Sequence, residues 1–267
     1  MERKLAAIRA DEDPEMREKM LEALVDPSAV ADIESSLDDL TKLAPDDLVT
    51  EATLLLLRKW AESDGDSAAT WTGQLPSGPL REAGLSGVAI EWANTSLPDA
   101  AAWAGSLPDE TERQSAALAV ANEAVRSEPV EALRLSADLA ASPQRDELIC
   151  RAAMEWASHD GPSAADWARQ IADESLREQV MSAIAMAWSE SDPVPAADLA
   201  LEIPPGRTQA DAVMGIVQRW AQHQPDRAAT WVDQFPAGEF KQNAFENLVL
   251  IGNAGLFDDP AVETDGK

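Results

Sequence analysis

The sequence has little of what sheets, disulfides and catalytic centres require. It contains no tyrosine, four phenylalanines, one cysteine and two histidines. Because sheets are enriched in aromatic and β-branched residues, this composition disfavours a fold built on strands. A single cysteine forms no disulfide within the chain, so cysteine usage does not indicate an oxidising compartment. No run of about 18 apolar residues occurs, so the sequence predicts no transmembrane helix.

Positive charge is also scarce. Lysine and arginine number 21 against 49 aspartates and glutamates, which gives a net charge of −28. Nucleic acids and anionic membranes are bound through clustered cations, so both are disfavoured as partners. Two interpretations of the acidity stay open: solubility in a salty environment, and recruitment of a basic protein or peptide.

The N-terminal segment shows no sign of secretion. Its basic start is followed by Asp11, Glu12 and Asp13 before any apolar segment appears. A signal peptide would need an apolar stretch at this place. We therefore expect a cytoplasmic protein by default.

What the sequence does contain is a spacing of 32 residues. A pair of apolar residues eleven positions apart, first seen in the stretch WAESDGDSAATW, recurs through six units without an insertion. The pairs are Trp60 and Trp71, Trp92 and Trp103, Ala124 and Leu135, Trp156 and Trp167, Trp188 and Leu199, and Trp220 and Trp231. Such regularity over a fixed period is typical of repeat architectures.

Each unit is predicted to form a helical hairpin. Apolar residues recur 8, 11 and 15 positions after the first member of each pair, which places them on one face of a helix of about 10 residues. A helix of about 13 residues follows and is expected to end at the next tryptophan. The position 8 residues after the first member is alanine in every unit, as a close helix crossing requires. These alanines are Ala68, Ala100, Ala132, Ala164, Ala196 and Ala228.

The tryptophans allow two interpretations. They can be core wedges that fill the gap between successive hairpins, or a ladder of exposed rings that binds sugars or peptides. The third unit, with Ala124 and Leu135, keeps the apolar character and loses the rings, which favours the wedges.

The fold class predicted is all-α: a right-handed α-solenoid of about six two-helix repeats over residues 46–250. Residues 1–45 are expected to be divergent N-terminal capping helices, with helices over 14–24 and 27–43. Gly252 and Gly255 are expected to end the helical pattern, so residues 251–267 are predicted to form an acidic flexible tail.

Few residues point to chemistry. His159 and His223 occupy equivalent positions two repeats apart, too far to share a metal, and are interpreted as polar capping residues. No histidine is placed to activate Cys150, which is interpreted as a core residue. The segment Asp64-Gly65-Asp66-Ser67 lacks the remaining ligands of a calcium loop and is interpreted as a turn. We predict no catalytic residue, no metal and no cofactor.

One polar position recurs with the repeat. Twenty-one residues after the first member of each pair stand Arg81, Arg113, Arg145, Arg177, Gln209 and Lys241. A cation at the start of a helix opposes the helix dipole, so propensity does not explain it. The side chain can bond the free carbonyls of the preceding helix or pair with an acid in the turn, such as Asp109 or Glu174. Alternatively, the five cations form a ladder that binds an acidic peptide or an anion.

The paired helices at a fixed period resemble the α-solenoid class, whose familiar members are tetratricopeptide and HEAT repeats. The resemblance covers residues 46–250 and is architectural, because the tetratricopeptide period is 34 and its pattern needs a tyrosine. A closer likeness is to the form W-A-x3-D-P-x-A-A-x-W-x3-L-P, found in tryptophan- and alanine-rich repeats of uncharacterised bacterial proteins. That likeness implies no established activity and no functional residue.

The leading hypothesis is a non-enzymatic scaffold that presents a curved groove to a protein or peptide, with Arg81, Arg113, Arg145, Arg177 and Lys241 as candidate partner-binding residues. A second recurring position lies 31 residues after the first member of each pair. Its residue is basic in the first and last units and acidic in three units between them, and this charge pattern could select a partner. It comprises Lys59, Glu91, Glu123, Glu155, Ala187 and Arg219. The alternatives are a carboxylate-based enzyme or carbohydrate-binding sensor in the groove, and a purely structural spacer.

Overall fold

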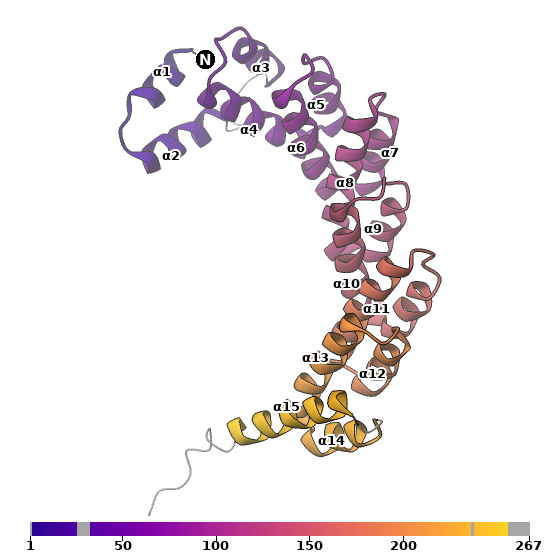
Figure 1. Cartoon of the computed structure of the whole chain (residues 1–267). Coiled ribbons are helices and arrows are strands. Elements are labelled where there is room, and N and C mark those ends of the chain that lie inside the picture. Colours follow the sequence, from indigo (N-terminus) through magenta and orange to yellow (C-terminus); the bar gives the residue numbers. More distant parts are fainter. Residues whose placement is uncertain (1, 26–32, 236–237, 256–267) are drawn as a thin grey trace, which may run out of the picture. The chain divides into compact units, whose positions relative to one another are not determined.

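The computed structural model describes residues 2–25, 33–235 and 238–255, and these form fifteen helices and no strand (Figure 1). The all-α class is therefore confirmed. The chain divides into two compact units, Met1–Ala140 and Ala141–Lys267. The boundaries predicted at residues 45 and 250 stay predictions.

In the first unit, long helices lie side by side and short helices pack against them (Figure 1). The helices are α1 (Glu2–Ala10), α2 (Pro14–Val25), α3 (Ile33–Thr41), α4 (Asp47–Ser63), α5 (Gly65–Thr72), α6 (Pro79–Thr95), α7 (Leu97–Ser106), α8 (Glu110–Ser127) and α9 (Pro129–Ser136). Helix α4 packs on α6, and α6 packs on α8. Helices α5, α7 and α9 each contact the long helix before them, α5 and α7 also contact the long helix after them, and α3 contacts α4.

The second unit has the same alternation of long and short helices. It contains α10 (Pro143–Ala168), α11 (Glu174–Trp188), α12 (Pro193–Glu202), α13 (Arg207–His223), α14 (Pro225–Asp233) and α15 (Glu239–Gly255). Helix α10 is bent at Asp160, whose backbone is not helical (φ −145°, ψ 74°), so it is a long and a short helix in direct succession. Helices α10, α11, α13 and α15 pack in that order.

A single residue joins several of the long helices to the short helix that follows. The N–H of Asp64 donates to the Trp60 carbonyl, and the Asp64 carboxylate accepts from the N–H of Ser67 at 3.0 Å. Asp64 therefore ends α4 and caps the start of α5. The turn predicted over Asp64-Gly65-Asp66-Ser67 is confined to Asp64, because the other three residues form the first turn of α5. Helices α4, α6 and α13 continue three residues past the tryptophan and have 17 residues each, whereas α11 ends at Trp188 after 15 residues. The expected length of about 13 was therefore too short.

The recurring alanines lie where the helices cross. All six are 0 % exposed, which confirms their expected burial. A second buried position lies on the long helices, where the side chains are also 0 % exposed. It comprises Val88, Val120, Ala152, Ile184 and Ile216. The core of each unit is thus the contact between the long and the short helices.

The N-terminal region agrees with the prediction in part. Helix α2 confirms the helix expected over residues 14–24; Leu21 and Leu24 are buried, and Met16 is 44 % exposed. Helix α3 begins at Ile33, and residues 26–32 of the second predicted helix lie outside the described residues. Helix α1 was not predicted, because only Leu5 and Ile8 among its many charged residues are buried.

Helix α15 corrects the expectation for the C-terminal end. It continues through Gly252 to Gly255. A single glycine inside a helix costs only about 1 kcal/mol relative to alanine, which packing can offset. Residues 256–267 of the predicted tail lie outside the described residues.

Candidate functional site

The recurring polar position bonds the end of the preceding short helix. Its side chain donates to the carbonyl oxygen six residues earlier. The pairs are Arg81 to Leu75 (3.0 Å), Arg113 to Leu107 (2.6 Å), Arg177 to Ile171 (2.8 Å) and Gln209 to Ile203 (2.6 Å). Carbonyls at a helix end have no partner within the helix, so this contact satisfies an acceptor that the fold leaves free.

Two residues at this recurring position, Lys241 and Arg145, do not make the same hydrogen bond as the other four. Lys241 donates to the carbonyl oxygen of Asp233 at 2.5 Å and to its carboxylate at 2.9 Å. The Nε of Arg145 is buried without a hydrogen-bond partner among the described residues. Helix-end bonding thus accounts for most of the recurring cations, and their role in binding a partner stays a prediction.

Arg81 also joins two long helices. Its guanidinium donates to both carboxylate oxygens of Glu112, at 2.7 and 2.8 Å, across the contact of α6 with α8. The two side chains are 17 % and 10 % exposed, and the hydrogen bonds to Glu112 raise the pKa of Arg81. By contrast, Arg113 pairs within its own helix with Glu110, whose side chain is 67 % exposed.

This difference predicts unequal losses of stability. Arg81→Met removes a bidentate pair and leaves Glu112 nearly buried, so we expect the free energy of unfolding to fall by about 2 kcal/mol. Arg113→Met loses an exposed pair and one carbonyl contact, and we expect about 1 kcal/mol or less. Urea unfolding followed by circular dichroism measures both, and equal losses would show that the Glu112 pair contributes nothing beyond the shared carbonyl contact.

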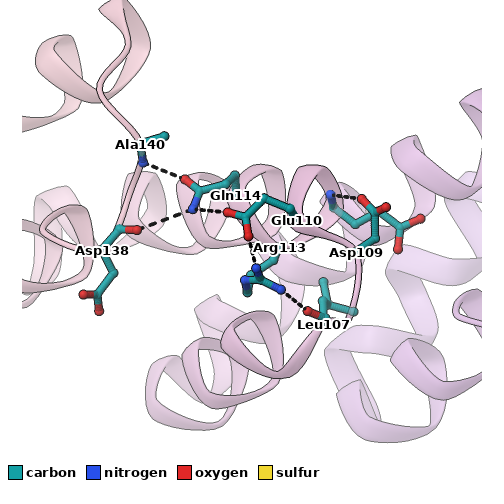
Figure 2. A network of polar contacts seen from close by, with 8 residues as sticks. Leu107, Asp109, Glu110, Arg113, Gln114, Asp138 and Ala140 are labelled. Carbon is teal, nitrogen blue, oxygen red and sulfur yellow. Dashed lines mark hydrogen bonds and ion pairs between the residues drawn. The ribbon is translucent and has the colours of Figure 1, made fainter.

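A polar network surrounds the start of α8 (Figure 2). Gln114 receives the N–H of Ala140 on its side-chain oxygen at 2.8 Å and donates through its nitrogen to the Asp138 carbonyl and to Glu110. One turn earlier, Asp109 accepts the N–H of Glu112 at 3.0 Å and caps the helix. The network therefore fixes the loop after α9 onto α8. The sequence did not reveal Gln114, because it belongs to no recurring position.

The tryptophans are packed, and none of the nine rings belongs to the exposed residues. Trp71, Trp220 and Trp231 are at most 7 % exposed. Within three hairpins the two rings lie 5.7, 6.3 and 6.0 Å apart between centroids. Trp71 also donates from Nε1 to Asp38 of α3 at 3.0 Å. This burial supports the wedge interpretation and speaks against a ladder of exposed rings.

Two of the rings lie directly on a glycine. A Cβ added at Gly65 would lie 2.3 Å from the ring of Trp92, and one added at Gly161 would lie 2.3 Å from the ring of Trp188. The equivalent residues 32 positions after Gly65 and Trp92 are Leu97 and Ala124, both buried. At this pair a large residue stands in the first position and a small one in the second, which accounts for the absence of a ring at Ala124.

Free carboxylates remain on the long helices. At the recurring position that comprises Lys59, Glu91, Glu123, Glu155, Ala187 and Arg219, the two basic residues are engaged. Lys59 bonds Glu62 at 2.8 Å, and Arg219 bonds the Met186 carbonyl at 2.9 Å. The acidic middle is different, because its half-buried carboxylates make no hydrogen bond or ion pair in the described part of the chain. They are those of Glu91, Glu123 and Glu155. The basic ends are thus engaged within the chain and the acidic middle is available.

A cleft between the starts of α6 and α8 is acidic as well. The cleft between α6 and α8 has a volume of about 300 Å³. Its lining includes Glu82, Asp109 and Glu112 together with Ser86 and Ser115. Glu112 is engaged by Arg81 and Asp109 caps α8, so Glu82 is the carboxylate that this cleft leaves to a ligand.

The two histidines and the cysteine considered for chemistry are not grouped into a site. His159 places Nδ1 3.0 Å from the Glu155 carbonyl of its own helix, and His223 is exposed at the end of α13. Burial, with the charges of Asp146 and Glu147, raises the pKa of the Cys150 thiol to about 11. Among the described residues, no group of three or more His, Cys, Asp or Glu side chains is arranged to hold a metal ion.

The raised pKa predicts a slow thiol. At pH 8 the thiolate fraction of Cys150 is about 100-fold below that of a thiol with the ordinary value of 9.0, so alkylation by iodoacetamide should be slower by at least that factor. The rate should rise as the pH approaches 11, because deprotonation supplies the nucleophile. Mass spectrometry of alkylated protein against a free cysteine peptide measures this, and equal rates at pH 8 would contradict the burial of the thiol.

No protein-family model matches the chain, and the searches of curated proteins and of solved structures found no match either. Within the described ranges, no helix is both long enough and apolar enough to cross a membrane.

Proposed function

We propose that the protein is a right-handed α-solenoid of about six 32-residue hairpins, and that it acts as a non-enzymatic scaffold for a basic protein or peptide segment. Contacts that recur between equivalent residues support the repeat. The helix-end hydrogen bond returns at positions 81, 113, 177 and 209, and the glycine–tryptophan contact returns at Gly65 and Gly161. Arrays of this kind offer long surfaces to extended partners.

The observation that carries the function is the distribution of charge. The recurring cations are largely engaged with helix-end carbonyls and nearby acids, whereas Glu91, Glu123 and Glu155 have no partner in the described residues. With a net charge of −28, ion pairs within the chain leave most carboxylates without a cation. A surface of this sign attracts positively charged partners and repels nucleic acids.

The pKa values of the carboxyl groups support a non-catalytic role. Where a shift is resolved among the described carboxyl groups, hydrogen bonds lower the pKa. The groups are Asp46, Asp64, Glu131, Asp160 and Glu202. A carboxylate-based enzyme would need an acid with a raised pKa.

A pair of synthetic peptides tests the proposal. One is an amphipathic helix of leucine and lysine, and its control carries glutamate at every lysine position. We expect the lysine peptide to bind at least about tenfold more tightly at about 50 mM salt and to weaken at about 500 mM, where charges are screened. Fluorescence anisotropy with the full chain measures the affinities. Equal affinities for the two peptides, or no binding of either, would contradict the proposal, and the second result would favour a structural spacer.

A further inference from the structure

Three methionines that are not fully buried lie on the long helices of the second unit. Met154 of α10 and Met186 of α11 are 32 residues apart, and Met214 of α13 lies one turn before the next equivalent position. Met154 is 42 % exposed, and Met186 and Met214 are half-buried. Helix α10 packs on α11 and α11 packs on α13, as Figure 1 shows. The Sδ of Met186 would lie 3.6 Å from a Cβ added at Gly215 of α13, so this side chain reaches the neighbouring helix.

These methionines, here called the methionine face, point away from the core. Each is two residues from a fully buried residue of the same helix: Ala152, Ile184 and Ile216 respectively. Two residues correspond to about 200° around a helix, so the methionine face lies opposite the side that the short helices cover.

Carboxylates accompany the methionine face. Glu147 and Glu155 lie on α10, Glu178 on α11 and Asp211 on α13. The first three make no hydrogen bond or ion pair within the described ranges, and the fourth has a 3.4 Å contact with the highly exposed Arg207.

Two cations share this region, and both have partners within the chain. Arg219 bonds the Met186 carbonyl and Glu190, and Arg151 also has an intrachain interaction. The charge left to a partner beside the methionines is therefore negative.

We propose that the methionine face is the docking site for one basic amphipathic helix, an inference that rests on the proposed scaffold function. Methionine is unbranched and polarizable, so it adapts to apolar side chains of varied shape. Neighbouring helices are about 10 Å apart, and seven residues of a helix span about 10.5 Å. Apolar anchors at every seventh position can thus meet the three methionines in turn, while lysine or arginine beside them meets the carboxylates.

Oxidation footprinting tests the site on the full chain. The probe is a leucine–lysine helix with leucine at every seventh position, at saturating concentration, and hydrogen peroxide oxidises the methionines. We expect Met154 to be oxidised several-fold more slowly with the peptide than without it. Met16, 44 % exposed in the first unit, is the internal control and should keep its rate. An unchanged rate at Met154 under saturation would overturn the proposal.

Variants separate the site from the general function. Met154→Gln with Met214→Gln should weaken the probe about tenfold, the size expected when apolar anchors lose their contacts. Val194→Gln with Leu201→Gln, which changes exposed apolar residues of α12, should leave the affinity unchanged. If the peptide binds and the methionine variants bind equally well, the site is wrong and the scaffold function stands. If the peptide fails to bind the unchanged chain at low salt, the scaffold function and this site both fail.

Discussion

Gly65→Ala should destabilise the first unit by about 3 kcal/mol, because the added methyl group meets a ring that cannot easily move. The new Cβ would lie 2.3 Å from Cγ of Trp92, close to where the ring joins its own backbone. Urea unfolding followed by tryptophan fluorescence gives the change in free energy. Gly161→Ala should have a similar effect in the second unit, where Trp188 has the same contact.

Two controls separate the contact from the effect of alanine itself. Gly105→Ala places a methyl group in α7 with no atom within 4 Å, and helix propensity should raise stability by up to about 1 kcal/mol. In a Trp92→Ala background, Gly65→Ala should cost less than about 0.5 kcal/mol, because the ring is gone. An unchanged cost in that background would mean that Trp92 is not the cause.

Ala100→Leu should also destabilise the chain by about 3 kcal/mol. Ala100 is 0 % exposed at the crossing of α7 with the long helices, and the added atoms force the helices apart. Differential scanning calorimetry should show a clearly lower melting temperature.

The neighbouring Ala102 provides the matched control, because it is exposed on the same short helix. Ala102→Leu keeps helix propensity almost unchanged and should alter stability by no more than about 0.5 kcal/mol. Similar losses at the two positions would show that the helices do not approach closely at Ala100.

The features predicted best are those that recur along the sequence. The sequence has alanine at the same position of every hairpin, which predicted a close helix crossing, and all six alanines are 0 % exposed. The helix-end role of the recurring cations was one of two open interpretations, since the same charges could have served a ligand. The distances show the helix-end contact itself, such as 2.8 Å from Arg177 to the Ile171 carbonyl, and the binding of a partner by these cations stays a prediction.

Features that occur once were missed or misjudged. Helix α1 has only two buried anchors, and the contacts of Gln114 depend on a loop 24 to 26 residues away. The methionine face was also missed. Met154 and Met186 share a position, but the equivalent residues of the other hairpins are not methionine, so the pattern is visible only when adjacent helices are seen together.

Excision of one repeat tests the central claim, that a 32-residue hairpin is the building block, most directly. Removing Leu97–Glu128 joins Ser96 to Pro129 and replaces one cap residue by its equivalent. Removing only α8, Glu110–Ser127, is the smaller change but breaks the alternation of long and short helices. We predict that the first variant keeps its helix content per residue and unfolds cooperatively, and that the second does not. Loss of cooperative folding in the first variant to the same extent as in the second would contradict the account.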